Sequence, residues 1–400
     1  MKTIGDQQLV KRINRSVILR LVRAQPGLSR AQLAGESGLT KSTVSMLARE
    51  LIEEGWLAEA SGPTSSGMGR PSTPLVINDT ARGLLGVELA VDCLRVVGVT
   101  LLGEVVHSLH EPLRSREPAR VCQQLAAMVA KAHQQLVARG LQPLGLGVGL
   151  PGAFDEATGL VWFAPNLAWR HVDILPQIIA ALAAVGVPPM PVHVQNDADT
   201  GALSEYEFAS DSDSGKTALV FVACSVGVGA GIVLNDRLFT GEHGMAGEIG
   251  HSILQIGGPR CSCGRRGCAE AFVGAQAIAR DIAQHGHADA AGVYLGTLIH
   301  NLWTTFNPAV LVLGGPSCVE NSRLVQVARD VLNQHALDSG MTPPVVRVAR
   351  YGLLASAVGA AALLLHHYLR PMNPRSTPAV DIPNAPVKPV ARTQHQLLAA

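Results

Sequence analysis

Three successive stretches in the first 55 residues place hydrophobic side chains at the spacing of an amphipathic helix. Ser29 and Thr40 supply N-cap side chains for the second and third helices. Pro26-Gly27, Gly38 and Gly55 end the three helices in turn. The apolar positions are Val10, Ile13, Val17, Ile18 and Leu21, then Leu33 and Ala34, then Val44, Leu47, Ala48, Leu51 and Ile52.

A short hairpin is expected after the third helix. Trp56-Leu57 is typical of one strand and residues 75–77 of its returning partner, while residues 62–74 between them are rich in Gly, Ser and Pro. Three helices followed by a two-stranded hairpin predict a winged helix-turn-helix, which we assign to residues 1–82.

From Gly83 onward the pattern changes to short aliphatic strands separated by glycines. Three strands, a helix, a strand and a second helix follow one another, and a similar order begins again near residue 218, so we expect two similar α/β lobes over residues 83–370. The expected strands are 84–89, 94–100, 103–107, 144–150, 192–195, 218–223, 229–234 and 310–313. The expected helices are 121–136 and the stretch after residue 195 that runs through Glu205.

The last apolar stretch, Gly352 to Leu365, is too short for a bilayer, which needs roughly 20 apolar residues, so it predicts a buried helix. Residues 371–400 hold six prolines with little periodicity and predict a disordered tail. The amino terminus lacks the apolar core of a signal peptide, and we expect a cytoplasmic protein that does not enter the membrane.

Composition supports large buried cores. Hydrophobic residues make up 47% of the 400 residues and charged residues only 16%, which excludes an intrinsically disordered chain. The formal net charge of +1 says nothing about nucleic acid, but residues 1–30 carry seven basic side chains against the single acid Asp6. This asymmetry indicates a basic N-terminal module.

The third helix has the side chains of a DNA recognition helix. Its outward positions carry short hydroxyls and long cations near the helix start, which suit phosphate and base contacts in the major groove. In the loop of the hairpin, Arg70 follows Gly69 and precedes Pro71, a setting in which a guanidinium can enter a minor groove. An ordinary solvated face is the alternative. The DNA-binding candidates are Lys41, Ser42, Thr43, Ser45, Arg49 and Arg70.

A cluster of metal-ligating residues lies near the middle of the chain. His251, Cys261, Cys263 and Cys268 follow the pattern H-x9-C-x-C-x4-C, and three thiolates with one imidazole predict a closed, structural zinc site with one ion per chain. The alternative is a reduced cysteine cluster beside an unrelated histidine. The other four cysteines lie in apolar contexts and are expected in the core.

The same region resembles the ROK family, named for repressors, open reading frames and kinases. The resemblance rests on GMAGEIGH at 244–251, CSCGRRGCAE at 261–270, GLPG at 149–152 and QNDA at 195–198. It covers roughly residues 84–365 and implies a two-lobe, actin/hexokinase-like (ribonuclease H-like) body with a sugar in the cleft. The N-terminal module extends the resemblance to the repressors of the family.

Sugar hydroxyls need paired donors and acceptors in a preformed cleft, and the matched motifs supply them. His251 can bind zinc through one ring nitrogen and donate to a hydroxyl through the other. Asp197 matches the general base of the ROK kinases, so it is the kinase-base equivalent here. Asn166 is a weaker candidate for which a turn role is equally plausible. The sugar-binding candidates are Gly152, Asn196, Asp197, Glu248, His251 and Glu270.

The resemblance leaves two classes of function, because ROK proteins include ATP-dependent sugar kinases. Those kinases hold phosphate with an Asp-x-Gly-Gly-Thr loop after the first strand, whereas residues 86–92 here read GVELAVD, without the glycines and the hydroxyl. A second glycine-rich stretch, 225–231, is present and suits either a phosphate or a tight turn. We therefore expect no catalytic residue and favour a sugar-responsive transcriptional regulator of carbohydrate genes over a kinase. A repressor controlled by a protein partner is the third reading.

The expected partners follow from this assignment. Two recognition helices on one face of double-stranded operator DNA require a two-fold axis, which predicts a homodimer, with a homotetramer also compatible. The effector is a sugar or a sugar phosphate. The sequence is compatible with several sugars, with several operator sequences, and with activation as well as repression.

Overall fold

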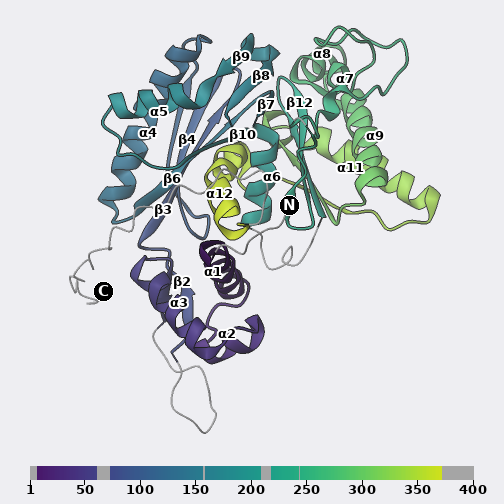
Figure 1. Ribbon diagram of the computed structural model, residues 1–400. Coiled ribbons are helices and arrows are strands. Elements are labelled where there is room, and N and C mark those ends of the chain that lie inside the picture. The colour runs from purple at the N-terminus through teal and green to yellow at the C-terminus, as the bar shows by residue number, and fades with distance from the viewer. Residues whose placement is uncertain (1–6, 61–72, 156–157, 209–217, 243, 372–400) are drawn as a thin grey trace, which may run out of the picture.

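The computed structural model describes residues 7–60, 73–155, 158–208, 218–242 and 244–371, and Figure 1 shows their arrangement. Arg70, most of the hairpin loop and the expected disordered tail lie outside these residues. The N-terminal module lies below a larger body of two lobes, and helix α12 occupies the middle of that body (Figure 1).

The N-terminal module is the predicted three helices and hairpin. They are α1 (Gln7–Ala24), α2 (Arg30–Ser37), α3 (Lys41–Glu53), β1 (Leu57–Glu59) and β2 (Leu75–Ile77), with the two strands antiparallel. Ser29 caps α2 in a capping box with Gln32, and the Thr40 hydroxyl accepts a hydrogen bond from the backbone N–H of Thr43 at 3.2 Å. Gly38 ends α2 in the left-handed conformation.

The body contains two five-stranded sheets with the same strand order. The first runs β10-β6-β3-β4-β5 and the second β15-β14-β11-β12-β13, and in both the three sequential strands are antiparallel and the other two are parallel. This confirms the expected repeat. The strands are β3 (Arg82–Leu89), β4 (Cys93–Thr100), β5 (Val105–Pro112), β6 (Gln142–Leu150), β10 (Val192–Asn196), β11 (Ala218–Cys224), β12 (Val228–Leu234), β13 (Arg237–Leu238), β14 (Val310–Gly314) and β15 (Val345–Val348).

Helices cover the sheets, and the structure contains further strands and helices that the periodicity did not predict. Two helices, α4 (Pro118–Ala138) and α12 (Ala355–Leu369), pack on the first sheet, while α6 (Asp197–Glu207) packs against α12 and against β11 and β12 of the second sheet. Beyond these lie β7 (Ala153–Asp155), β8 (Leu160–Ala164), β9 (Trp169–Asp173), α5 (Ile174–Ala184), α7 (Glu270–Val273), α8 (Ala275–His285), α9 (Asp289–Phe306), α10 (Pro316–Val319) and α11 (Ser322–Ser339), with short 3₁₀ turns at Pro165–Leu167, Ile249–His251 and Gly352–Leu354.

Helix α12 is a core helix. Residues Gly352–Leu369 are long and apolar enough, by length and composition, to cross a membrane, but 72% of them are buried inside the protein. They pack between the first sheet and α6, which confirms the expectation of a buried helix. Helix α12 ends at Leu369, four residues beyond the apolar segment Gly352 to Leu365 that the sequence indicated.

Glycines allow α6 and α12 to touch backbone to backbone. A Cβ atom on Gly359 of α12 would lie 1.5 Å from the carbonyl oxygen of Thr200 in α6. On the other side of α6, a Cβ on Gly231 of β12 would lie 2.2 Å from the carbonyl oxygen of Ala198. These close approaches leave α6 no room to shift independently of α12 and β12.

The contact between the two helices predicts a large effect of a single methyl group. Gly359→Ala should destabilise the protein by at least about 2 kcal/mol, because the added carbon overlaps a backbone atom that no rotamer change can move away. Gly35→Ala in α2 is the matched control, since nothing lies within 4 Å of its added carbon. That variant should gain up to about 1 kcal/mol of helix propensity. Urea unfolding of both variants beside the wild type measures this, and equal midpoints would contradict the packing.

Candidate functional site

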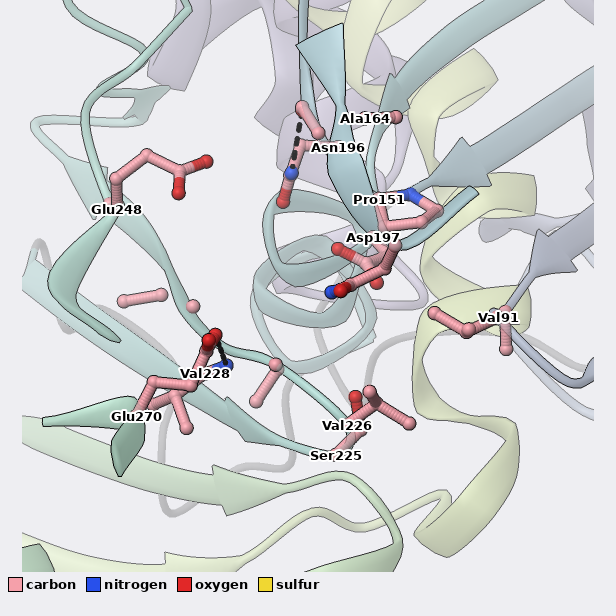
Figure 2. A pocket seen from close by; sticks show the side chains of 18 of the residues that line it. Val91, Pro151, Ala164, Asn196, Asp197, Ser225, Val226, Val228, Glu248 and Glu270 are labelled. Atoms are coloured by element: carbon pink, nitrogen blue, oxygen red, sulfur yellow. Dashed lines mark hydrogen bonds between the residues drawn. The ribbon is translucent and has the colours of Figure 1, made fainter. Parts of the chain in front are cut away.

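A cavity of about 230 Å³ lies between the two lobes, beyond the carboxyl ends of β3, β6 and β10 and beside the β11–β12 turn. Clefts at the carboxyl ends of parallel strands are common ligand sites in α/β proteins. All six sugar-binding candidates line it, and so does Asn166. Figure 2 shows the acids facing the same space from opposite sides: Asp197 from the first lobe, Glu248 and Glu270 from the second.

Asn196 joins β10 to α6 and has a structural task that the sequence did not indicate. Its side-chain oxygen caps α6 by accepting hydrogen bonds from the backbone N–H groups of Ala198 and Asp199, at 2.8 and 3.3 Å. Its side-chain nitrogen donates to the carbonyl oxygen of Gly152 at 3.1 Å. Among the residues that the structure describes, the second N–H of this amide has no acceptor and can donate to a ligand.

Gly152 is required by packing. Its φ is 113°, and a Cβ there would lie 2.5 Å from the carbonyl oxygen of Phe163 in β8. The glycine holds the turn after β6 against β8, and together with Asn196 it forms one wall of the cavity.

Asp197 begins α6 and sits among other acids. Burial, followed by the negative charges of Glu88 and Glu248, raises the pKa of Asp197 to about 7. Burial also raises the pKa of Glu88, which pairs with Arg95 at 2.9 Å. In the sequence Glu88 belongs only to the stretch that replaces the phosphate loop, whereas in the structure it is a further carboxyl group of the cavity.

The second lobe contributes its groups through the loop that follows β13 and through α7. Nε2 of His251 lies 4.0 Å from a carboxylate oxygen of Glu248. Glu270 accepts hydrogen bonds from the Ser262 hydroxyl at 2.7 Å and from the backbone N–H of Val228 at 3.4 Å. These contacts join the cysteine-rich loop to the wall of the cavity.

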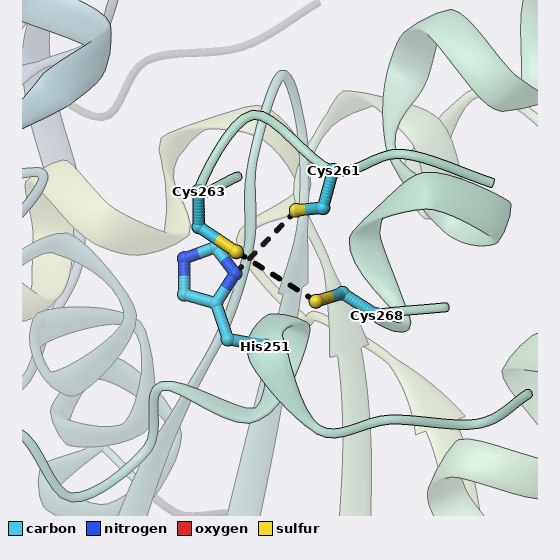
Figure 3. A group of neighbouring side chains, drawn as sticks. All are labelled: His251, Cys261, Cys263 and Cys268. Carbon is cyan, nitrogen blue, oxygen red and sulfur yellow. Dashed lines mark hydrogen bonds between the residues drawn. The ribbon is translucent and has the colours of Figure 1, made fainter. Parts of the chain in front are cut away.

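The predicted metal ligands converge. The ligand atoms of His251, Cys261, Cys263 and Cys268 all lie within 4.8 Å of one another (Figure 3). Nδ1 of His251 is 3.7 Å from the Cys261 sulfur, and the sulfurs of Cys263 and Cys268 are 3.7 Å apart. Because Nδ1 faces the sulfurs, Nε2 of the same ring points toward Glu248 and the cavity. The four remaining cysteines are buried, as expected.

Helix α3, the predicted recognition helix, exposes most of the residues expected on its outer surface. Lys41, Ser42, Ser45 and Arg49 are exposed on α3 and Thr43 is half-buried, while the opposite face packs into the core of the module. The hydroxyls of Ser42 and Thr43 each lie 2.9 Å from that of Thr40, so they also stabilise the helix start. Met46 is also exposed on α3, at 50%, among these polar residues.

A helix-turn-helix module on a two-lobed α/β body defines a DNA-binding regulator. The sequence profile described as the ROK family matches residues 84–367, and the one described as the IclR helix-turn-helix domain matches residues 17–61. The first match spans well over half of the chain, and the chain belongs to the ROK family.

Named relatives match along nearly their whole length. The xylose repressor of Bacillus subtilis (strain 168) is 29% identical over 393 residues, which cover 92% of this chain and 98% of the relative. The DNA-binding transcriptional dual regulator NagC of Escherichia coli (strain K12) is 28% identical over 396 residues, covering 90% and 94%. Both are similar to this chain over the DNA-binding module and the body together.

Solved structures agree with this arrangement. A ROK family transcriptional regulator, described as a homolog of the E. coli MLC protein, superposes with a TM-score of 0.72 at 25% identity and covers 90% of this chain and 97% of its own. A ROK family glucokinase from Streptomyces griseus, in complex with glucose and AMPPNP, gives a TM-score of 0.61 at 22% identity and covers 70% of this chain and 98% of its own. The second likeness shows the fold of the body alone.

The raised pKa of Asp197 predicts a pH-dependent stability. The ordinary pKa is 3.8, so between about pH 4 and pH 7 the unfolded chain loses a proton that the native chain retains. The native state is therefore destabilised as pH rises through this window, by on the order of 2 kcal/mol for a group that borders an open cavity. Asp197→Asn should remove this loss.

Thermal midpoints of the wild type and the variant, measured from pH 4 to pH 8, provide the test. Asp330→Asn on the exposed face of α11 is the control and should follow the wild type. If the difference between Asp197→Asn and the wild type is the same at pH 4 and pH 8, the carboxyl group is already ionised at low pH and this reading of the cavity is wrong.

Proposed function

We propose that the protein is a sugar-responsive transcriptional repressor of carbohydrate genes. The observation that carries the proposal is that one chain joins a winged helix-turn-helix to a body whose inter-lobe cavity is lined by acids, an amide and a histidine. Relatives named xylose repressor and NagC match over both parts. We divide the chain into a DNA-binding domain at 1–82, a sugar-binding body at 83–370 and a tail at 371–400.

In this proposal the cavity holds one sugar or sugar phosphate. A volume of about 230 Å³ is close to the lower end of small-molecule pockets. Asp197, Glu248 and Glu270 accept hydrogen bonds from hydroxyls, and Nε2 of His251 donates one. The free N–H of Asn196 donates another, and Gly152 shapes the wall between them.

We assign a structural zinc ion to the cysteine-rich loop. Zn–S bonds of about 2.3 Å in a tetrahedron separate two thiolate sulfurs by about 3.8 Å, and the observed separation is 3.7 Å, so the residues fit the metal. His251, Cys261, Cys263 and Cys268 would be the ligands. The ion would hold His251 in one tautomer and orientation and keep Ser262 against Glu270.

An ATP-dependent sugar kinase is the second candidate, because kinases share the fold of the body. Catalysis of phosphoryl transfer needs donors and cations around the transferred phosphate. Here the wall where the phosphate loop would lie contributes Glu88 and Asp92 together with the side chain of Val91, which points toward the cavity (Figure 2). Asp92 repels a trianionic group, and Arg95, a cation that lines the same wall, is already paired with Glu88 at 2.9 Å. We therefore propose that the protein does not phosphorylate its ligand.

The remaining parts of the proposal concern partners. Lys41, Ser42, Thr43, Ser45 and Arg49 would contact operator DNA from α3, and Arg70 would do so from the hairpin loop. Two such modules on one operator call for a homodimer or homotetramer. The chain would act in the cytoplasm, where the DNA is.

The zinc assignment predicts about one zinc ion per purified chain. Cys263→Ser should lower the metal content and weaken sugar binding, since the loop that positions Glu270 and His251 loses a ligand. Cys122→Ala, in the core of the first lobe, is the control and should keep the metal. Metal analysis combined with a thermal-shift titration of sugar measures both effects. Zinc-free protein with normal stability and full sugar binding would contradict the assignment.

The sugar-response proposal predicts that ligand in the cavity releases DNA. The probes are D-xylose, N-acetyl-D-glucosamine and their phosphates, with a duplex selected by the protein from a random-sequence pool. At a fixed salt concentration, a sugar that raises the thermal midpoint should weaken DNA binding by about 5–150-fold. Asp197→Asn and Glu248→Gln should bind the duplex as the wild type does, because neither lies in the DNA-binding module, but should need much more sugar to release it.

ATP turnover in the same samples separates the two candidates. The repressor proposal expects none above background. Robust turnover that Asp197→Asn abolishes, with no sugar-dependent change in DNA binding by the wild type, would overturn the proposal in favour of the kinase. DNA release that needs a protein partner and no sugar would support the partner-controlled alternative.

A further inference from the structure

Helix α6 connects the cavity to the DNA-binding module. Its first residue is Asp197 in the cavity and its last is Glu207, so its 11 residues span about 15 Å. The side chain of Glu207 is only 2% exposed, and Arg23, near the end of α1 in the DNA-binding module, pairs with it at 3.1 Å. The guanidinium of Arg23 also donates to the backbone carbonyl of Glu207.

Glu207 gathers three partners from two other helices. Besides Arg23 of α1, its carboxylate contacts Nδ1 of His366 in the last turn of α12 at 2.8 Å and the guanidinium of Arg370, which directly follows α12, at 2.5 Å. Burial alone would raise the pKa of Glu207, but Arg370, His366 and Arg23 outweigh it and hold the pKa well below its usual range. The buried carboxylate is therefore charged and fixed in position by α1 and α12 together.

The cavity end of α6 is held as firmly. The hydroxyl of Ser356 in α12 donates to the carbonyl oxygen of Asp197 at 2.9 Å, and the cap from Asn196 ties the helix start to Gly152. Further along α6, Glu205 has a fully buried side chain that pairs with Arg347 of the second lobe at 2.6 Å. With Gly359 seated on Thr200, α6 can move only as a unit with its surroundings.

A second contact attaches the DNA-binding module to α12 alone. Arg15 of α1 donates to the Tyr368 hydroxyl at 2.8 Å, and the rings of Trp56 and Tyr368 stack with centroids 4.2 Å apart. This contact seats the module on the body. In the part of the chain that the structure describes, the Arg23–Glu207 pair is the ion pair between this module and α6 itself.

We propose that Arg23 is a positioning residue that couples the sugar cavity to DNA binding: α6, moved at Asp197 by the occupied cavity, shifts the DNA-binding module through Glu207 and Arg23. The proposal rests on the proposed function and names the route of its regulation. A rigid helix with a ligand group at one end and a buried ion pair at the other is a single element that both sites can bias.

Arg23→Gln tests the route. This variant removes the charge on the module and leaves Glu207 with Arg370 and His366, so the buried carboxylate stays paired and the fold is preserved. We expect it to bind the selected duplex and the sugar separately, each within about threefold of the wild type. The ratio of DNA affinities without and with sugar should fall from about 5–150-fold to below about twofold. Arg23→Lys should recover part of the ratio.

The controls separate coupling from loss of positive charge and from loss of folding. Arg30→Gln removes another basic side chain of the same module, one that pairs with the exposed Glu59, and should keep the full ratio. Glu207→Gln should lose the ratio as Arg23→Gln does, and the double variant should lose no more than either single variant. Thermal midpoints with and without sugar report whether each variant is folded and still binds the ligand.

Two results would overturn the proposal, and they differ. If Arg23→Gln is folded, binds sugar and keeps the ratio of the wild type, the coupling does not run through this pair, while the proposed function stands. If the wild type itself shows no ratio with any of the four sugar probes that stabilise it, the proposed function fails and the coupling fails with it.

Discussion

The packing of α6 between α12 and β12 is the constraint on which the rest of the structure depends. Glycines at the two faces of α6 bring backbones into direct contact, which leaves no layer of side chains to absorb a relative shift. Because α12 also packs on the first sheet and its end contacts α1, the helix links both lobes and the DNA-binding module. A displacement of α6 at the cavity must therefore also displace the elements that pack against it.

The position of α6 also determines which acidic side chains line the cavity. The start of α6 places Asp197 beside Glu88 of β3, and the second lobe adds Glu248 and Glu270 from the other side. Acids so close together favour hydroxyls, since a ligand that donates hydrogen bonds relieves their mutual repulsion. The cysteine-rich loop holds His251 and Glu270 toward the cavity, so its metal site would support the ligand site without reacting in it.

Local signals predicted the parts of this protein that depend on neighbouring residues. The three N-terminal helices followed from caps at Ser29 and Thr40, and the cysteine cluster from spacing alone. Long-range relationships left no local signal: Asn196 matched a motif as a sugar ligand, yet its amide also caps α6. Glu207 and Arg23 are 184 positions apart and only the fold brings them together. The glycine-rich stretch 225–231 is compatible by its sequence with a phosphate loop or a tight turn, whereas in the structure Gly231 of β12 makes room for α6.

Amide hydrogen exchange tests the central claim most directly, because it reports on each helix in the unmodified protein. The measurement compares the protein alone with the protein bound to whichever of D-xylose, N-acetyl-D-glucosamine or their phosphates stabilises it. The account predicts that protection changes together in the cavity loops, along α6 and at the end of α1 around Arg23, and that Arg23→Gln removes only the last change. Changes confined to the cavity loops, with α1 unaffected in the wild type, would contradict it.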